Sequence, residues 1–236
     1  MQLFYNSTLT PSSSQIIFEK DESRHIIKVL RKQVGDILDL TDGYGNFYKA
    51  TLESSNPKQC IAHIKGVEAQ PKPEYNLHLA VAPTKLNDRY EWFLEKATEI
   101  GITQITPIIC DHSERKVIKP ERYEKIIQSA AKQSLKAYFP ILNDAVSFKE
   151  FICTASEIET HRYIAHCEDA KKQSLKSVLK FQKDITILIG PEGDFSTSEI
   201  EFALKNNFDA IHLGKNRLRT ETAAIVACHS VSYHFV

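Results

Sequence analysis

Apolar positions follow two different periods along this chain, and the change falls near residue 70. Upstream, short alternating runs predict strands, the first two joined as a hairpin by a glycine-containing loop: residues 37–41, 47–52 and 59–67. The segment Gln70–Glu74 carries two prolines and predicts a break. Downstream, strands alternate with helices, a pattern typical of a parallel sheet covered by helices. We therefore predict a β-rich domain over 1–70 and an α/β domain over 71–236.

Within the α/β domain, short apolar runs predict buried strands, namely 77–81, 105–109, 163–166, 185–189 and 211–213. Apolar residues recur at helical spacing from 86 to 100, and Gly101 is expected to cap that helix. Pro120 is placed to open the next helix at its first turn. Ser196, with Glu199 three residues later, fits a capping box, and Thr220 is expected to cap the last helix.

A basic amphipathic helix is predicted in the first domain, from Asp21 to Lys32. Ile26 and Val29 would face inward, with Ile27 and Leu30. The opposite face carries Arg24, Lys28, Arg31 and Lys32. A solvated charged face and a nucleic-acid contact explain such a cluster equally well.

Composition narrows the class of protein. The 236 residues are 42% hydrophobic and 25% charged, which is ordinary for a globular protein. Lys plus Arg (30) equals Asp plus Glu (30), so a nucleic-acid partner would have to meet local basic patches. The five cysteines form no C-x-x-C pair, which argues against a disulfide framework or a metal site. No signal peptide or run of about 20 apolar residues is visible. We therefore expect a cytoplasmic protein that does not associate with a membrane.

Two strand-to-helix turns carry the candidate chemistry, at the sheet edge where open α/β folds bind ligands. In the first turn, Gly190 and Gly193 would allow positive φ and close approach of a ligand to the backbone. Glu192 in the same turn needs a partner or a cationic ligand if water is excluded, and otherwise faces solvent.

The second turn places Arg217, Arg219 and Glu221 within five residues. Arg219, just before the helix, could bind a phosphate or stabilise a developing oxyanion. An ion pair with a nearby carboxylate is the alternative. Glu221 in the first helical turn also suits the helix dipole.

These motifs carry a resemblance to a known family. Gly190–Gly193 followed by the Leu-Arg-Thr-Glu-Thr-Ala segment 218–223 resembles the bacterial 16S ribosomal RNA uridine-N3 methyltransferases of the SPOUT superfamily. The match extends over nearly the whole chain, through Lys85, Arg89, Glu95–Gly101, Gln133-Ser134 with Pro140, and His25 with Val29–Arg31. Two positions depart from the family pattern: Asp194 stands where a second glycine is usual, and Lys136 where an arginine is usual.

The resemblance implies a PUA-like β-barrel domain followed by an α/β methyltransferase domain with a deep C-terminal trefoil knot. It further implies a homodimer that binds S-adenosylmethionine in the knot loops and methylates N3 of a uridine in 16S rRNA of the small ribosomal subunit. The cofactor residues that it implies are His166, Cys167, Glu168, Gly190, Pro191, Glu192, Gly193, Leu213, Gly214, Asn216, Leu218 and Thr222.

For catalysis, Arg219 is expected to stabilise the uracil oxyanion or orient a phosphate. Glu221 or Glu192 would orient that arginine or accept the N3 proton. The basic residues expected to contact RNA are Arg24, Lys28, Arg31, Lys85, Arg89, Arg115, Lys116, Lys136 and Arg217.

Other functions compete with this one. The same fold could methylate another RNA, such as a transfer RNA or 23S rRNA, or could bind RNA without catalysis. Loss of Glu192, Arg219 or Glu221 would have favoured the non-enzymatic alternative, and all three are present. An enzyme that binds nucleotide phosphates at the first turn would be expected to have a longer glycine-rich loop ending in Lys-Ser/Thr, which is absent.

Overall fold

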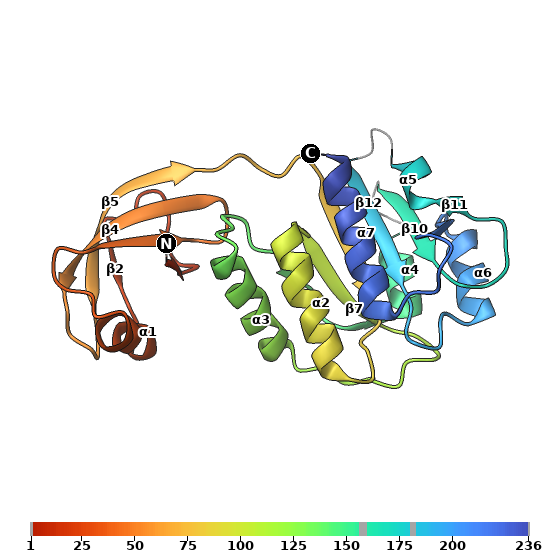
Figure 1. The fold of residues 1–236 in the computed structure, drawn as a ribbon, viewed down its shortest axis with the longest axis horizontal. Coiled ribbons are helices and arrows are strands. Elements are labelled where there is room, and N and C mark those ends of the chain that lie inside the picture. Colours follow the sequence, from red (N-terminus) through yellow and green to blue (C-terminus); the bar gives the residue numbers. More distant parts are fainter. Residues whose placement is uncertain (1, 156–159, 180–182, 236) are drawn as a thin grey trace. The chain divides into compact units, whose positions relative to one another are not determined.

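The computed structural model describes residues 2–155, 160–179 and 183–235 (Figure 1). The chain divides into two compact units. One comprises Met1–Lys72 and Ala131–Phe139, and the other Pro73–Ala130 and Pro140–Val236. The short segment 131–139 belongs to the first unit although it follows a long stretch of the second, a feature that the apolar pattern does not reveal.

The first unit is built on a five-stranded sheet of order β1-β3-β4-β5-β2. The strands are β1 Leu3–Tyr5, β2 Gln15–Ile17, β3 Ile37–Thr41, β4 Asn46–Ser54 and β5 Ile61–Ala69. The predicted hairpin is confirmed, since β3 and β4 pair antiparallel with Leu40 opposite Tyr48. Only β1 and β3 run parallel. Alternate residues such as Leu38, Leu40 and Tyr48 are buried in this unit's core.

The turn between β3 and β4 is organised by a buried carboxylate. Asp42 accepts hydrogen bonds from the backbone N–H groups of Tyr44 and Asn46, from the Asn46 amide and from the Tyr48 hydroxyl. Burial alone would raise the pKa of Asp42, but these hydrogen bonds outweigh it and the pKa lies below its usual value. The ionised carboxylate thus holds the hairpin turn.

The predicted basic helix is shorter than expected. The α-helix α1, Lys20–Arg24, passes into a π-helical turn, His25–Val29, and Arg31 then adopts a left-handed φ of 55°. Ile26 is fully buried as predicted, but the inward placement of Val29 is wrong, because Val29 is 64% exposed. A π turn holds more residues than an α turn, so the apolar pattern rotates out of phase within this segment.

The second unit contains the predicted parallel sheet, of order β11-β13-β10-β12-β6-β7-β8, with β9 also beside β7. The strands are β6 Asn76–Val81, β7 Gln104–Ile109, β8 Ile141–Leu142, β9 Val146–Ser147, β10 His161–Ala165, β11 Gln173–Ser174, β12 Asp184–Ile189 and β13 Asp209–His212. The central strands are apolar on both faces: Leu77, Leu79 and Val81 join one core, and Ala80 joins the other.

Helices cover both faces of this sheet (Figure 1). They are α2 Asn87–Ile100, α3 Pro120–Gln133, α4 Phe148–Ala155, α5 Leu175–Val178, α6 Thr197–Lys205 and α7 Thr220–His234. Helices α2 and α7 lie side by side on one face, and α4 packs with α6 on the other. The last helix is rich in small residues that are fully buried, among them Ala224, Ala227 and Cys228, so it packs closely against its neighbours. No helix among the described residues is both long and apolar enough to cross a bilayer.

Of the helix-boundary signals expected in the second unit, three are confirmed and one is wrong. Gly101 caps α2 with φ 122°, Pro120 opens α3, and Ser196 and Glu199 form the predicted capping box of α6. The prediction that Thr220 caps α7 is wrong, because Arg219 occupies the cap position and Thr220 is the first helical residue.

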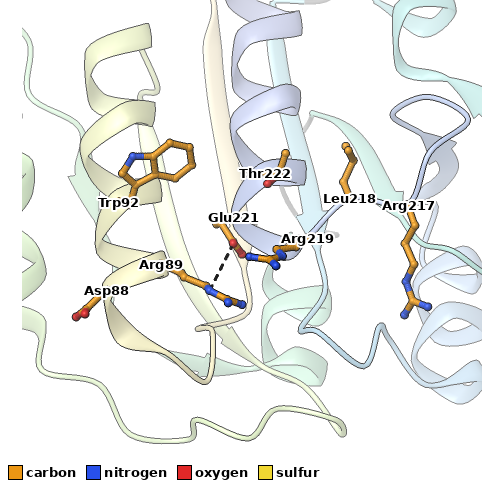
Figure 2. Close-up of a pocket in the computed structure, with 8 residues that line it drawn as sticks. All are labelled: Asp88, Arg89, Trp92, Arg217, Leu218, Arg219, Glu221 and Thr222. Atoms are coloured by element: carbon orange, nitrogen blue, oxygen red, sulfur yellow. Dashed lines mark ion pairs between the residues drawn. The ribbon is translucent and has the colours of Figure 1, made fainter.

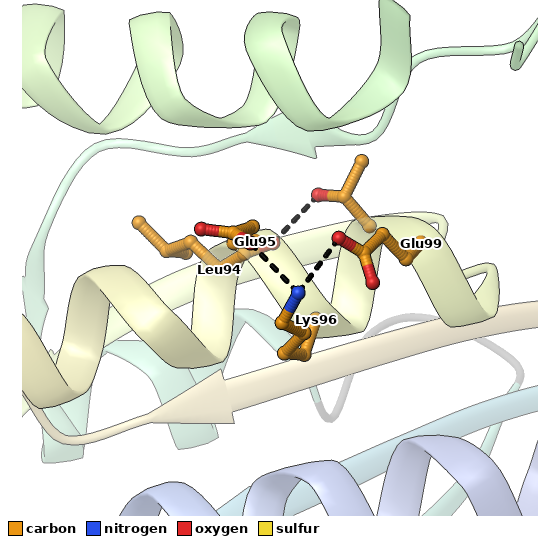
Figure 3. Close-up of polar contacts among 5 residues, drawn as sticks. Leu94, Glu95, Lys96 and Glu99 are labelled. Atoms are coloured by element: carbon orange, nitrogen blue, oxygen red, sulfur yellow. Dashed lines mark hydrogen bonds and ion pairs between the residues drawn. The ribbon is translucent and has the colours of Figure 1, made fainter. Parts of the chain in front are cut away.

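The charged residues of the 95–101 segment stabilise their own helix (Figure 3). The ammonium of Lys96 donates to Glu95 at 2.7 Å and to Glu99 at 2.9 Å, and these hydrogen bonds raise the pKa of Lys96. The Thr98 hydroxyl donates to the Leu94 carbonyl one turn earlier. This part of the motif therefore supports the scaffold of α2.

Candidate active site

The loops that follow β6, β10, β12 and β13 meet at one edge of the sheet because these strands run parallel. A cavity of about 380 Å³ lies among the loops after β10, β12 and β13. Its lining is Ala165, Cys167, Ile189, Gly190, Pro191, Glu192, Asp194, Arg217, Leu218, Arg219, Thr220 and Ala223. We call it the loop cavity.

A second cavity, of about 660 Å³, adjoins the first between α2 and the start of α7 (Figure 2). Its lining is Asp88, Arg89, Trp92, Arg217, Leu218, Arg219, Glu221 and Thr222. We call it the helix cavity. Arg217, Leu218 and Arg219 line both cavities, so one short segment separates two sites of ligand size.

Asp194 links the first two loops. Its Oδ2 accepts a hydrogen bond of 2.6 Å from the backbone N–H of Cys167, and its backbone φ is +63°. The expected positive φ at Gly190 and Gly193 is wrong, since Asp194 adopts the left-handed conformation of this turn. The glycines serve close packing instead: a Cβ would lie 3.1 Å from the Phe195 ring at Gly190, and 3.2 Å from His112 Cβ at Gly193.

The third loop is tied to the second by Thr220. Its hydroxyl donates to the Gly190 carbonyl at 3.0 Å in a buried position. This hydrogen bond fixes the start of α7 against the end of β12. The side chain that sequence reasoning assigned to a helix cap therefore joins the two turns.

Glu192 has a partner, and the partner is backbone. Its Oε1 accepts a hydrogen bond of 2.9 Å from the N–H of Lys85, in the loop after β6. Arg115 holds the same loop by donating to the carbonyl oxygens of Thr84 and Lys85. The ammonium of Lys85 lies 2.7 Å from Glu114, and that hydrogen bond raises the pKa of Lys85. These charged side chains thus position a loop at the edge of the site.

Glu221 is buried in the wall of the helix cavity, with 6% of its surface exposed. Its Oε1 lies 3.8 Å from the Arg89 Nε, the ion pair drawn in Figure 2. Its Oε2 is buried and has no hydrogen-bond partner among the described residues. A buried carboxylate oxygen without a donor is costly in a folded protein.

His166, directly after β10, is also buried, and neither ring nitrogen has a partner among the described residues. Burial and the nearby Lys172 lower the pKa of His166, which favours a neutral ring. Lys172 closes this loop by donating to the carbonyl oxygens of His166 and Glu168. Burial, followed by the charge of Asp194, raises the pKa of the Cys167 thiol.

The structure brings together part of the expected cofactor set. Five residues of this expected set line the loop cavity, namely Cys167, Gly190, Pro191, Glu192 and Leu218. One further member, Thr222, lines the helix cavity. The remaining members of the expected set line neither cavity: His166, Glu168, Gly193, Leu213, Gly214 and Asn216. Glu168 instead accepts a hydrogen bond from the Thr197 hydroxyl.

The expected RNA-binding residues divide between the two units. Those of the first unit are the exposed Arg24, Lys28 and Arg31 and the half-buried Lys136. Those of the second are Lys85, Arg89, Arg115, Lys116 and Arg217. Arg89 pairs with Glu221 and Arg115 binds backbone, whereas Arg217 is exposed and lines both cavities.

Sequence reasoning missed several cavity residues. Asp88 and Trp92 lie on α2 and line the helix cavity, while Ala165, Ile189 and Ala223 line the loop cavity. The three apolar residues resemble ordinary core positions. Trp92 carries a signal that was available in the sequence. It is a large aromatic residue that falls outside the buried stripe of α2, which includes Tyr90, Phe93 and Leu94.

The fold and the site together define an α/β enzyme whose ligand sites are formed by loops at the carboxyl edge of a parallel sheet. Comparison with known proteins gives the family. Residues 70–232 match the family described as an RNA methyltransferase domain, and residues 18–65 match an RNA methyltransferase PUA domain. The chain belongs to this RNA methyltransferase family, and its first unit contains a PUA-like domain.

Individual relatives support the same family assignment. The ribosomal RNA small subunit methyltransferase E of Rickettsia conorii is 31% identical, over 98% of this chain and 94% of its own. The crystal structure of a probable rRNA-methyltransferase from Porphyromonas gingivalis is 41% identical with a TM-score of 0.89, over 99% of each chain. A ribosomal RNA small subunit methyltransferase E from Neisseria gonorrhoeae, crystallised with S-adenosylmethionine, is 26% identical with a TM-score of 0.87, over 99% of this chain and 97% of its own.

Proposed function

We propose that this protein transfers a methyl group from S-adenosylmethionine to N3 of a uridine in the 16S rRNA of the small ribosomal subunit. One observation supports this function above others. Two cavities of ligand size adjoin at the carboxyl edge of the sheet and share the wall Arg217–Arg219. A methyl transfer needs two such sites, because donor and acceptor must meet across a short distance.

The loop cavity suits the cofactor. Its volume of about 380 Å³ lies within the range of small-molecule sites, and Ile189, Leu218 and Ala223 give it apolar walls beside backbone groups of the Gly190–Gly193 turn. When bound there, S-adenosylmethionine supplies a methyl group activated by its sulfonium charge. The cofactor would be contacted by Cys167, Gly190, Pro191 and Leu218. The loops that carry these residues are fixed by the hydrogen bonds of Asp194 and Thr220.

Arg219 would carry the electrostatic part of the reaction. The N3–H of uracil is a weak acid, and its nitrogen becomes a good nucleophile only after the proton leaves. The negative charge then spreads to the flanking carbonyl oxygens, where a guanidinium stabilises it. Arg219 is exposed and lines both cavities, so its side chain can reach a base placed between them. The N3 proton passes to water, the N3 lone pair forms the new N–C bond, and the S–C bond breaks to leave S-adenosylhomocysteine.

Glu192 is assigned a positioning role, because its carboxylate already accepts the Lys85 N–H. Glu221 would contact the substrate in the helix cavity. Exposed arginines and lysines of both units would bind RNA phosphates. Such contacts position the protein on the RNA but do not read the nucleotide sequence. The residues are Arg24, Lys28, Arg31, Lys116 and Arg217.

Two larger features belong to the same proposal. We propose that the C-terminal segment forms the trefoil knot of the SPOUT superfamily. The strand order β13-β10-β12, the Thr220–Gly190 hydrogen bond and the small buried residues of α7 support it. We also propose that the protein acts in the cytoplasm as a homodimer, as the family resemblance implies. Light scattering of the purified protein tests the dimer directly.

The test of the function is methyl transfer from labelled S-adenosylmethionine to small subunits from a strain that lacks this protein, followed by nucleoside analysis. The expected product is 3-methyluridine. Subunits from the parent strain are the matched control and should accept no label, because their target already carries the methyl group. A different labelled nucleoside would overturn the uridine assignment. Label in transfer RNA or 23S rRNA instead of the subunits would overturn the substrate.

A further inference from the structure

The helix cavity contains a buried carboxylate whose role the methyl transfer itself does not require. Glu221 is 6% exposed, is held at 3.8 Å by Arg89, and has one oxygen without a donor among the described residues. Rotation about the terminal bond of a glutamate is nearly free, so either oxygen can face the cavity. Such an acceptor in a cavity wall points to a hydrogen-bond donor on the ligand.

An internal uridine in RNA has two hydrogen-bond donors, the N3–H of the base and the 2′-hydroxyl of the ribose. N3 is the atom that is methylated under the proposed function. At transfer its lone pair must point toward the loop cavity, and a carboxylate in line with it would block the methyl group. The 2′-hydroxyl is then the donor that remains for Glu221.

The geometry points to Glu221 as the group that recognises the ribose of the target nucleotide: we infer that its carboxylate accepts a hydrogen bond from the 2′-hydroxyl within the helix cavity. This inference rests on the proposed function and deepens it, because it assigns the sugar to the helix cavity while the reacting edge of the base faces the cofactor in the loop cavity. Arg89 acts as a positioning residue that fixes the carboxylate.

The other walls of the helix cavity fit a nucleotide. Trp92 is 47% exposed and offers an aromatic face, on which a base or ribose can pack. Arg217 and Arg219, on the shared segment, also line this cavity and would supply positive charge for the phosphate and the uracil oxygens. Figure 2 shows Trp92 and Arg89 on α2 facing Glu221 and Thr222 at the start of α7. The 2′-hydroxyl is the group by which a protein distinguishes RNA from DNA, so this contact would make the enzyme specific for RNA at the target position.

The experiment combines a protein change with a substrate change. Small subunits are reconstituted on 16S rRNA ligated from fragments, with either uridine or 2′-deoxyuridine at the position that nucleoside mapping identifies. Wild-type protein and Glu221→Met, which keeps the length of the side chain but has no oxygen acceptor, are assayed on both. Asp88→Asn is the matched control, since Asp88 is an exposed carboxylate in the wall of the same cavity.

We expect either single change to lower kcat/KM about 10- to 100-fold, and the two together to lower it little further, because both remove one hydrogen bond. Asp88→Asn should respond to 2′-deoxyuridine as the wild type does. Equal methylation of the two substrates by the wild type would overturn the inference while leaving the proposed function intact. If the loss for the variant on the 2′-deoxyuridine substrate were instead the product of the two single losses, the inference would be overturned as well. That result would show that Glu221 acts independently of the 2′-hydroxyl, in a structural role. No transfer to the all-ribose subunits would overturn the proposed function and this inference with it.

Discussion

The carboxylate of Asp194 accepts a 2.6 Å hydrogen bond from the backbone N–H of Cys167, and it does so from a left-handed backbone with φ of +63°. A second oxygen of Asp194 accepts from the N–H of Phe195. Aspartate is among the residues that tolerate this conformation, because its short side chain can bond locally. Here the side chain also joins the loops after β10 and β12.

This relationship predicts an order of stability among variants of Asp194. Asp194→Ala loses both hydrogen bonds and keeps the strained backbone, so we expect a loss of about 1–3 kcal/mol in the free energy of unfolding. Asp194→Gly also loses the bonds but relieves the strain, and should fall between alanine and wild type. Asp194→Asn keeps an acceptor and should lie closest to wild type. Urea unfolding measures the order; alanine as stable as glycine would contradict it.

Glu192 gives a prediction that separates positioning from proton transfer. The side-chain oxygen of glutamine can accept the Lys85 N–H as glutamate does, so Glu192→Gln should retain kcat within about threefold. Glu192→Ala removes the acceptor and should raise KM for the subunits, because the loop held by Arg115 loses a support. Steady-state kinetics on subunits that lack the modification measure both. A loss of about 100-fold or more in kcat for Glu192→Gln would instead identify Glu192 as the proton acceptor.

Arg219 is predicted to act on the reaction and not on cofactor binding. Arg219→Ala should lower kcat by about 100-fold or more, because charge on the uracil oxygens is no longer stabilised. The dissociation constant for S-adenosylmethionine, measured by calorimetry, should change less than about threefold. Lys215→Ala is the matched control, since Lys215 is an exposed cation of the same loop and lines neither cavity. A large loss of cofactor affinity in Arg219→Ala would place this arginine in the cofactor site.

The parallel sheet and the two strand-to-helix turns could be predicted because strongly apolar runs, Gly101, Pro120 and the Ser196 capping box are local signals. The contacts of the site could not. The donor to Glu192 is a backbone N–H more than a hundred residues away, and the pairing of Glu221 with Arg89 joins two helices. The short α4 was also missed, although Phe148, Phe151 and Ile152 are buried at helical spacing. At Val29 a π turn broke the period on which the prediction relied.

Thr220 tests the link between the last two loops. Thr220→Val has nearly the same shape but leaves the buried Gly190 carbonyl without its donor, so we expect a loss of about 1–3 kcal/mol in the free energy of unfolding. Thr220→Ser keeps the hydroxyl and is the matched control, with a smaller loss from the missing methyl group. Chemical denaturation followed by tryptophan fluorescence gives both values. Equal losses for valine and serine would show that packing, and not the hydrogen bond, fixes the start of α7.

His78 on β6 predicts how stability depends on pH. Burial lowers the pKa of His78 from 6.5 to about 4, and its Nε2 lies 2.7 Å from the Thr106 hydroxyl. Because the folded state binds this proton less well than the unfolded state, the stabilising contribution is complete above pH 6.5 and is lost as the pH falls toward 4. The loss attributable to His78 should reach about 3 kcal/mol at most. His78→Gln should flatten unfolding free energies measured between pH 4 and 6.5, whereas the exposed His63→Gln should leave their slope unchanged. An unaltered slope in His78→Gln would mean that other groups carry the acid sensitivity.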